Sequence, residues 1–189
     1  MEQQELQITE RSAKTKGEVN QLRRERQIPV CIYSQGKPAD IASCGEVELQ
    51  TILRNMRPGF LPTTVFSLKA GKGKARRAVI KDIQYKPTTY EVVHLDFQEL
   101  HDDTLVDIKV PIECLNQMDC SGVKLGGFLR TLIRHLKVRC LPKNIPSHFE
   151  IDVKELGLNQ NRRVSDLKIP QGVRALEKPN EIIVSVLKK

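Results

Sequence analysis

The sequence predicts a mainly β protein with a few helices, organised in two domains. Apolar residues fall in short runs that Pro and Gly residues interrupt, which is typical of short strands joined by turns. The 189 residues are 39% hydrophobic and 29% charged, a globular composition that fits one large domain or two small ones. An acidic, polar segment at residues 99–104 separates two such series of runs and predicts a joint there. We therefore expect domains at residues 1–100 and 101–189.

The first half contains the clearest local patterns. Residues 28–33 read as a strand that follows a short helix ending near Arg26, with a turn at 36–38. After Glu46, four apolar residues recur at i, i+3, i+4 and i+7, which predicts an amphipathic helix that Pro58 and Gly59 end: Leu49, Ile52, Leu53 and Met56. Further strands are expected at residues 64–68, 78–84 and 91–97, with turns at 71–73 and 86–89.

The second half returns to strand patterns after the polar joint. Val106, Ile108, Val110 and Ile112 alternate with polar residues, so they face one side of a predicted strand. Prolines separate the other expected strands, which lie at residues 136–141, 148–153 and 181–187. Residues 126–133 fit either a helix or a strand, and the pattern does not decide between them.

Two basic clusters carry most of the positive charge. Residues 11–26 hold six Lys or Arg against two Glu, and residues 69–86 hold seven against Asp82 alone. The remainder of the chain is close to neutral, although the formal net charge is +8. Local basic surfaces on a neutral body are the electrostatic pattern of a protein that binds a phosphate backbone, and RNA is the first partner to consider. Charge alone fits an ordinary solvated surface equally well.

Other classes of protein lack support in the sequence. No apolar run approaches the roughly 18 residues of a membrane span, and residues 1–5 lack the pattern of a signal peptide, so we expect a cytoplasmic protein. The five cysteines are scattered, without a CxxC pair, and read as reduced, partly buried thiols. We therefore expect no metal and no cofactor. The Gly71 to Lys74 turn lacks the spacing of a nucleotide-binding loop and reads as a basic hairpin turn.

His94 and Asp96 form the sharpest local constellation. On the strand at 91–97 a period of two places Val93, Leu95 and Phe97 on the core face, so His94 and Asp96 lie side by side on the other face. A catalytic role needs a nucleophile motif that the sequence does not show, and we expect no enzyme. On an RNA-binding sheet, His94 can stack on or hydrogen-bond a base, and Asp96 can accept from a base amino group. A solvated polar pair is the plainer alternative.

Several motifs then resemble one known family. In order and spacing, the chain is similar to the bacterial large-subunit ribosomal proteins that bind 5S rRNA, in their long two-domain form, also called the general stress protein CTC family. The matching segments in the first half are residues 22–33, 81–87 and 94–97, and those in the second half are 122–129, 138–146, 148–153 and 164–173. The resemblance covers nearly the whole chain.

The resemblance implies a six-stranded antiparallel β-barrel followed by a second, largely β domain. It also implies a structural, non-enzymatic role in the ribosome, with the barrel docked on 5S rRNA in the central protuberance of the large subunit. The residues that match the family's RNA-contacting positions are Arg11, Lys16, Arg23, Arg24, Tyr33, Gln84, His94 and Asp96. The basic clusters add Lys14, Lys72, Lys74, Arg76 and Arg77 as expected phosphate contacts. We expect a monomer when free and neighbouring ribosomal proteins in the particle.

Two departures from the family pattern bear on affinity. Residues 18–21 are Glu-Val-Asn-Gln where relatives commonly have a more basic stretch, and Ser34 stands where they commonly have glycine. An alternative role therefore remains, in which a stress-related protein acts through protein partners of its second domain.

Overall fold

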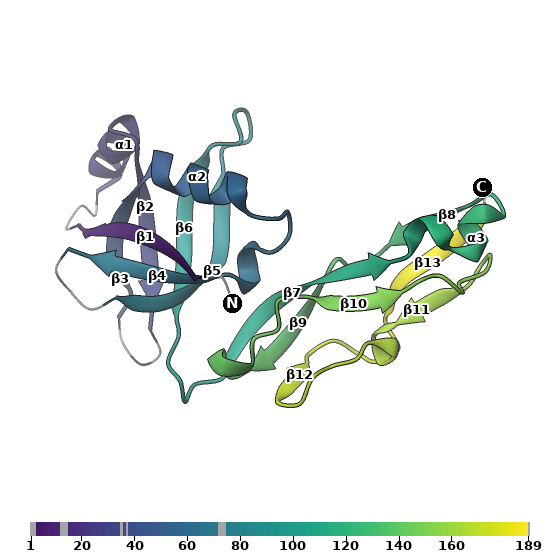
Figure 1. The fold of residues 1–189 in the computed structure, drawn as a ribbon. Coiled ribbons are helices and arrows are strands. Elements are labelled where there is room, and N and C mark those ends of the chain that lie inside the picture. Colours follow the sequence, from purple (N-terminus) through teal and green to yellow (C-terminus); the bar gives the residue numbers. More distant parts are fainter. Residues whose placement is uncertain (1–2, 12–14, 35, 37, 72–74, 189) are drawn as a thin grey trace. The chain divides into compact units, whose positions relative to one another are not determined.

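The computed structural model describes every residue except 1–2, 12–14, 35, 37, 72–74 and 189. The chain divides into two compact units, residues 1–104 and 105–189 (Figure 1). Among the described helices, none is long and apolar enough to cross a membrane. All five cysteines lie in the described part, and each is a free thiol.

The first unit is a closed β-barrel whose strands neighbour one another in the order β1-β3-β2-β6-β5-β4. The strands are β1 (Gln3–Glu10), β2 (Gln27–Tyr33), β3 (Asp40–Gly45), β4 (Val65–Ala70), β5 (Arg76–Tyr85) and β6 (Val92–Glu99). The prediction of a six-stranded barrel is confirmed, but its pairing is mixed rather than wholly antiparallel. β1 pairs with β4 and β2 pairs with β6 in parallel. Parallel neighbours need long crossovers, and the long stretches of chain between these strands supply them.

The barrel interior is filled by the inward side chains of all six strands. Leu6, Val30, Phe66, Leu95 and Phe97 are each 0% exposed. The rings of Phe66 and Phe97 meet edge to face, with centroids 5.5 Å apart. The alternation predicted for β6 is confirmed at Leu95 and Phe97, so Asp96 between them lies outside the barrel. At the start of the strand, Val92 rather than the predicted Val93 packs against the core.

Two α-helices accompany the barrel. Thr15 and Glu18 form a capping box at the start of α1 (Lys16–Arg24). The helix predicted after Glu46 is α2 (Glu46–Asn55), in which Leu49 is fully buried. Ile52, Leu53 and Met56 pack against the barrel core, as their spacing predicts. A short 3-10 helix, η1 (Leu61–Thr63), leads from α2 into β4.

The second unit consists of two small sheets. The first has the strand order β10-β7-β9-β12 and the second has the order β11-β13-β8. Its elements are β7 (Val106–Leu115), η2 (Gln117–Asp119), α3 (Ser121–Lys124), β8 (Gly127–Thr131), β9 (His135–Cys140), η3 (Pro142–Asn144), β10 (Phe149–Asp152), β11 (Asn161–Arg163), η4 (Val164–Asp166), β12 (Val173–Ala175) and β13 (Ile182–Lys188). The ambiguous segment 126–133 contains strand β8, because it pairs antiparallel with β13.

Candidate nucleic-acid interface

The outer face of β2, β6 and β5 brings together polar side chains that are far apart in the sequence. β6 lies between the other two strands, with Asp96 opposite Cys31 of β2 and His94 opposite Gln84 of β5. The side chains of His94 and Asp96 are each 21% exposed. We call this surface the β6 face, defined by Cys31, Tyr33, Gln84, His94 and Asp96.

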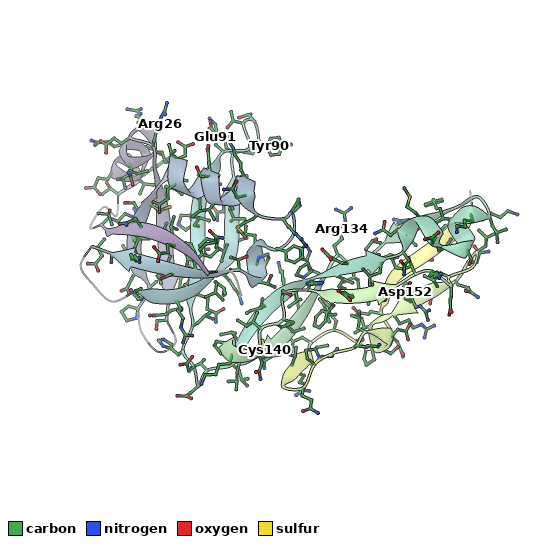
Figure 2. The ribbon with its side chains drawn as sticks, in the orientation of Figure 1. Arg26, Tyr90, Glu91, Arg134, Cys140 and Asp152 are labelled. Atoms are coloured by element: carbon green, nitrogen blue, oxygen red, sulfur yellow. The ribbon has the colours of Figure 1, made fainter. Side chains whose placement is uncertain are left out.

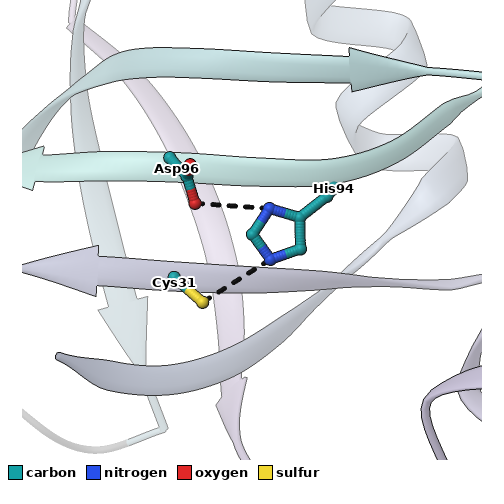
Figure 3. Close-up of side chains that lie close together, drawn as sticks. All are labelled: Cys31, His94 and Asp96. Carbon is teal, nitrogen blue, oxygen red and sulfur yellow. Dashed lines mark hydrogen bonds and ion pairs between the residues drawn. The ribbon is translucent and has the colours of Figure 1, made fainter. Parts of the chain in front are cut away.

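The His94 ring lies between a thiol and a carboxylate (Figure 3). Its Nε2 is 3.5 Å from the Sγ of Cys31, and its Nδ1 is 3.3 Å from Oδ1 of Asp96. Both Nδ1 and Oδ1 are shielded from water, yet within the described residues neither makes a well-directed hydrogen bond. Shielded polar atoms without good partners cost free energy.

Both members of the thiol–imidazole pair favour their neutral forms. Burial lowers the pKa of His94 below its usual value of 6.5, and the positive charges of Arg11 and Arg23 contribute in the same direction. Burial and the nearby Asp96 raise the pKa of the Cys31 thiol. An activated cysteine nucleophile requires a lowered thiol pKa, so Cys31 is not set up as a nucleophile.

The same trio is a poor three-ligand metal site. One ligand atom from each of Cys31, His94 and Asp96 lies within 4.8 Å of the others. However, the thiol lies beside Nε2 of the ring and the carboxylate lies beside Nδ1. A metal ion bound to one of these nitrogens would therefore be poorly placed for the ligand atom beside the other nitrogen. The three side chains are better placed to form hydrogen bonds to a ligand than to hold an ion.

Two arginines border the β6 face, and Tyr33 is its aromatic member. Arg11 follows β1, and its Nε donates to the Ala42 carbonyl at 2.9 Å. Arg23 of α1 donates from Nε to the Val93 carbonyl at 3.4 Å, beside His94. Tyr33 is 47% exposed, and the negative charge of Asp96 is the main cause that raises its pKa. These positions place two cations and one aromatic ring around the His94–Asp96 pair.

Helix α1 adds further positive charge. Lys16 and Arg24 are exposed on it, and Arg26 follows with a left-handed backbone, φ 57°. Figure 2 shows Arg26 beside α1 at one end of the barrel. For Arg23, Arg24 and Arg26, the described part of the chain offers no carboxylate within ion-pair distance. These three arginines therefore remain available to an external anion. Lys14 lies outside the described residues.

In the second basic cluster, most of the described cations pair with carboxylates of the protein. Arg76 binds Glu99 and Asp40, and Arg77 pairs with Asp102 at 2.5 Å. Arg76 also lies at the other end of β5 from Gln84, roughly 26 Å away along the strand. Arg76 and Arg77 are thus distant from Gln84 and His94, but not from Tyr33, because Tyr33 and Val79 both pair with Gln98 of β6. Lys72 and Lys74 lie outside the described residues.

Both departures from the family pattern have a structural role. Glu18 completes the capping box of α1: its Oε2 accepts from the Thr15 backbone N–H at 3.0 Å. Ser34 is 8% exposed, and its Oγ lies 2.8 Å from Nε2 of His101. Neither residue removes a cation or a polar group from the β6 face.

Comparison with known proteins identifies the family. Residues 6–97 match the Ribosomal L25p family, and residues 105–189 match the C-terminal domain of ribosomal protein TL5. The large ribosomal subunit protein bL25 of Chlamydia pneumoniae is 41% identical over 185 residues, which cover 98% of this chain and 100% of that protein. For bL25 of Chlamydia abortus the identity is 44% over 186 residues, with the same two coverages. The chain belongs to the bL25 family. It is a ribosomal protein of the two-domain form, and this family is not one of enzymes.

One member of the β6 face was not among the residues predicted for the bL25 site. Cys31 was read only as a partly buried thiol, yet it contacts His94 directly. The signal was present in the alternation of β2, because Cys31 stands two residues before Tyr33 and so shares its face. The contact with His94 could not be predicted from the sequence, since it depends on the parallel pairing of β2 with β6.

Proposed function

We propose that this bL25 protein binds 5S rRNA through the β6 face and helix α1, as a structural constituent of the central protuberance of the large ribosomal subunit in the cytoplasm. The observation that carries the proposal is the His94–Asp96 pair. Each side chain of the pair is 21% exposed, and the pair lies on the outer face of the sheet with Arg11 and Arg23 beside it.

Two kinds of contact are expected: phosphate contacts that position the protein on the RNA, and base or ribose contacts that make binding specific. Arg23, Arg24 and Lys16 would contact phosphates, which fixes the protein on the RNA without reading sequence. A carboxylate repels phosphate, so Asp96 favours a ligand only where a base amino group or a ribose hydroxyl donates to it. Gln84, directly opposite His94, offers a further donor and acceptor on the neighbouring strand.

The test is binding of the purified full chain to 5S rRNA over a salt series, with an RNA duplex of similar length as the competitor. We expect His94→Ala, Asp96→Ala and Gln84→Ala each to weaken binding about tenfold, or ~1.4 kcal/mol, with little change in the salt dependence. Gln7→Ala is the matched control, because Gln7 is exposed on β1 and lies outside the β6 face.

Two results would argue against the proposal. Equal affinity for 5S rRNA and for the duplex would reduce the β6 face to a general basic surface. Unchanged 5S rRNA binding by all three variants would remove the face from the interface and favour a role through protein partners of the second unit.

A further inference from the structure

We propose that the second unit carries a separate RNA-binding surface on the outer face of its β7-β9-β12 sheet. The surface consists of Lys109 on β7, Lys137 and Arg139 on β9, and Arg174 on β12, and we call it the basic sheet face. All four side chains are exposed, while the intervening Ile108, Val110, Leu136, Val138 and Cys140 are buried on the other side of the sheet.

The pairing register places like charges directly opposite one another. Lys109 faces Lys137 across the β7–β9 pair, and Arg139 faces Arg174 across the β9–β12 pair. Directly opposed like charges on one sheet face destabilise the free protein. Two adjacent pairs of this kind are a cost that an anionic partner relieves.

Only part of this charge is neutralised within the unit. Asp107 pairs with Arg139, with contacts of 2.6 and 2.8 Å, and Glu177 accepts from the Lys137 backbone N–H at 3.5 Å. For Lys109, Lys137 and Arg174, no carboxylate of the described residues lies within ion-pair distance of the side chain. Other carboxylates gather at β10 instead, where Glu150 is opposite Glu113.

The composition of the face favours RNA over an acidic protein. Strands β7, β9 and β12 contain no Phe, Tyr or Trp, and protein interfaces depend on buried aromatic or other apolar anchors. His135 of β9 has the one aromatic ring on these three strands, too few for a platform on which successive bases stack. The four cations form two rows, Lys109 with Lys137 and Arg139 with Arg174. The rows are two residues apart along β9, or about 7 Å, a spacing that suits contacts to successive backbone phosphates.

The inference is independent of the 5S rRNA proposal, because it rests on the second unit and on membership of a large-subunit protein family. The test uses the full chain with 23S rRNA and 5S rRNA, measured separately over a salt series. The face variant is Lys109→Gln with Lys137→Gln. The control is Lys154→Gln with Lys168→Gln, which removes the same charge from two exposed lysines elsewhere in the second unit.

We expect the face variant to bind at least one of these RNAs about tenfold more weakly than the parent, with a log–log salt slope shallower by about 2. The control should match the parent. The thermal midpoint of the face variant should equal or exceed that of the parent, because the Lys109–Lys137 repulsion is gone. This combination separates a binding role from a purely structural one.

Parent-like binding of the face variant to both RNAs would overturn the inference. An equal loss in the face variant and the control would also overturn it, since total charge alone would then explain the effect. If the face variant binds both RNAs normally but fails to enter large-subunit particles, the partner is an acidic protein and the RNA assignment is wrong. If the parent protein shows no preference for 5S rRNA, that result counts against the proposal for the β6 face and leaves this inference unaffected.

Discussion

Arg76 and Glu99 form a two-point ion pair at one end of the barrel. The Nε and Nη2 atoms of Arg76 donate to the two carboxylate oxygens of Glu99 at 3.0 and 2.9 Å, and Nη1 donates to Asp40 at 2.8 Å. The Arg76 guanidinium holds the pKa of Glu99 below its usual value. The Glu99 side chain is only 14% exposed, so this pair is more than a surface contact.

The first prediction concerns this pair. Glu99→Gln should lower the free energy of unfolding by about 2 kcal/mol, because it removes the better buried of the two carboxylates that bind a partly buried guanidinium. Urea denaturation at neutral pH measures the change. Asp102→Asn is the control: the Arg77–Asp102 pair is 44% exposed on both sides, and its loss should cost less than about 1 kcal/mol. Equal losses in the two variants would contradict the assigned role of Glu99.

The second prediction compares two pairs of arginines. Arg23→Gln with Arg24→Gln should reduce 5S rRNA affinity at least tenfold and make the salt slope shallower by about 2. Arg76→Gln with Arg77→Gln removes the same charge but should act mainly on stability, since both side chains already bind carboxylates. Filter binding of both variants, with circular dichroism to verify folding, checks this. A larger loss of affinity in the Arg76 and Arg77 variant would show that those arginines exchange their internal partners for phosphates.

The third prediction concerns a glycine in the second unit. A Cβ on Gly122 would lie 2.7 Å from Cγ1 of Val186 and 2.9 Å from the backbone of Gly157. Gly122→Ala should therefore lower the free energy of unfolding by about 1–3 kcal/mol, as overpacked cores do. Gly17→Ala is the contrast, because Gly17 lies in α1 with nothing within 4 Å of a new Cβ. That substitution should stabilise by up to about 1 kcal/mol. Thermal unfolding that ranks the variants the other way would refute both assignments.

Local sequence patterns predicted part of the fold. The i, i+3, i+4, i+7 spacing located α2, and the alternation in β6 placed His94 and Asp96 outside the barrel. Two strands of the barrel, β1 and β3, were not predicted, and neither were the short β11 and β12 of the second unit. β1 has only Leu6 and Ile8 among polar residues, and β3 contains mainly small residues. Their strand structure depends on pairing with each other and with distant segments, so local patterns carry little signal for them.

The candidate site was predictable only where it follows from alternation along one strand. His94 and Asp96 are neighbours on β6, so a period of two was sufficient to group them. The neutralisation of Arg76 could not be predicted, because Glu99 reaches it from the paired strand β6 and Asp40 from β3, which is not a neighbour of β5. Cys31 joins His94 for a similar reason, through a parallel pairing between strands more than sixty residues apart.

The last prediction concerns pH. The pKa of His94 in the folded protein lies below 6.5, mainly because burial disfavours the charged ring. The unfolded chain therefore takes up a proton at His94 before the folded protein does, and stability falls as pH drops below about 6.5. The loss ends once the pH is below the folded pKa, because both states are then protonated. Glu99, Asp119 and Asp152 have lowered pKa values, so they remain ionised in the folded protein throughout this range.

Urea denaturation of the parent and of His94→Gln between pH 7.5 and 5.5 measures this effect. The parent should lose stability across the range, and the variant should show a flatter profile, since its amide does not titrate. The difference at pH 7.5, where His94 is neutral in both states, reports packing alone and serves as the internal reference. A variant whose profile runs parallel to that of the parent would show that His94 keeps an ordinary pKa, and that the ring is better solvated than its position between Cys31 and Asp96 indicates.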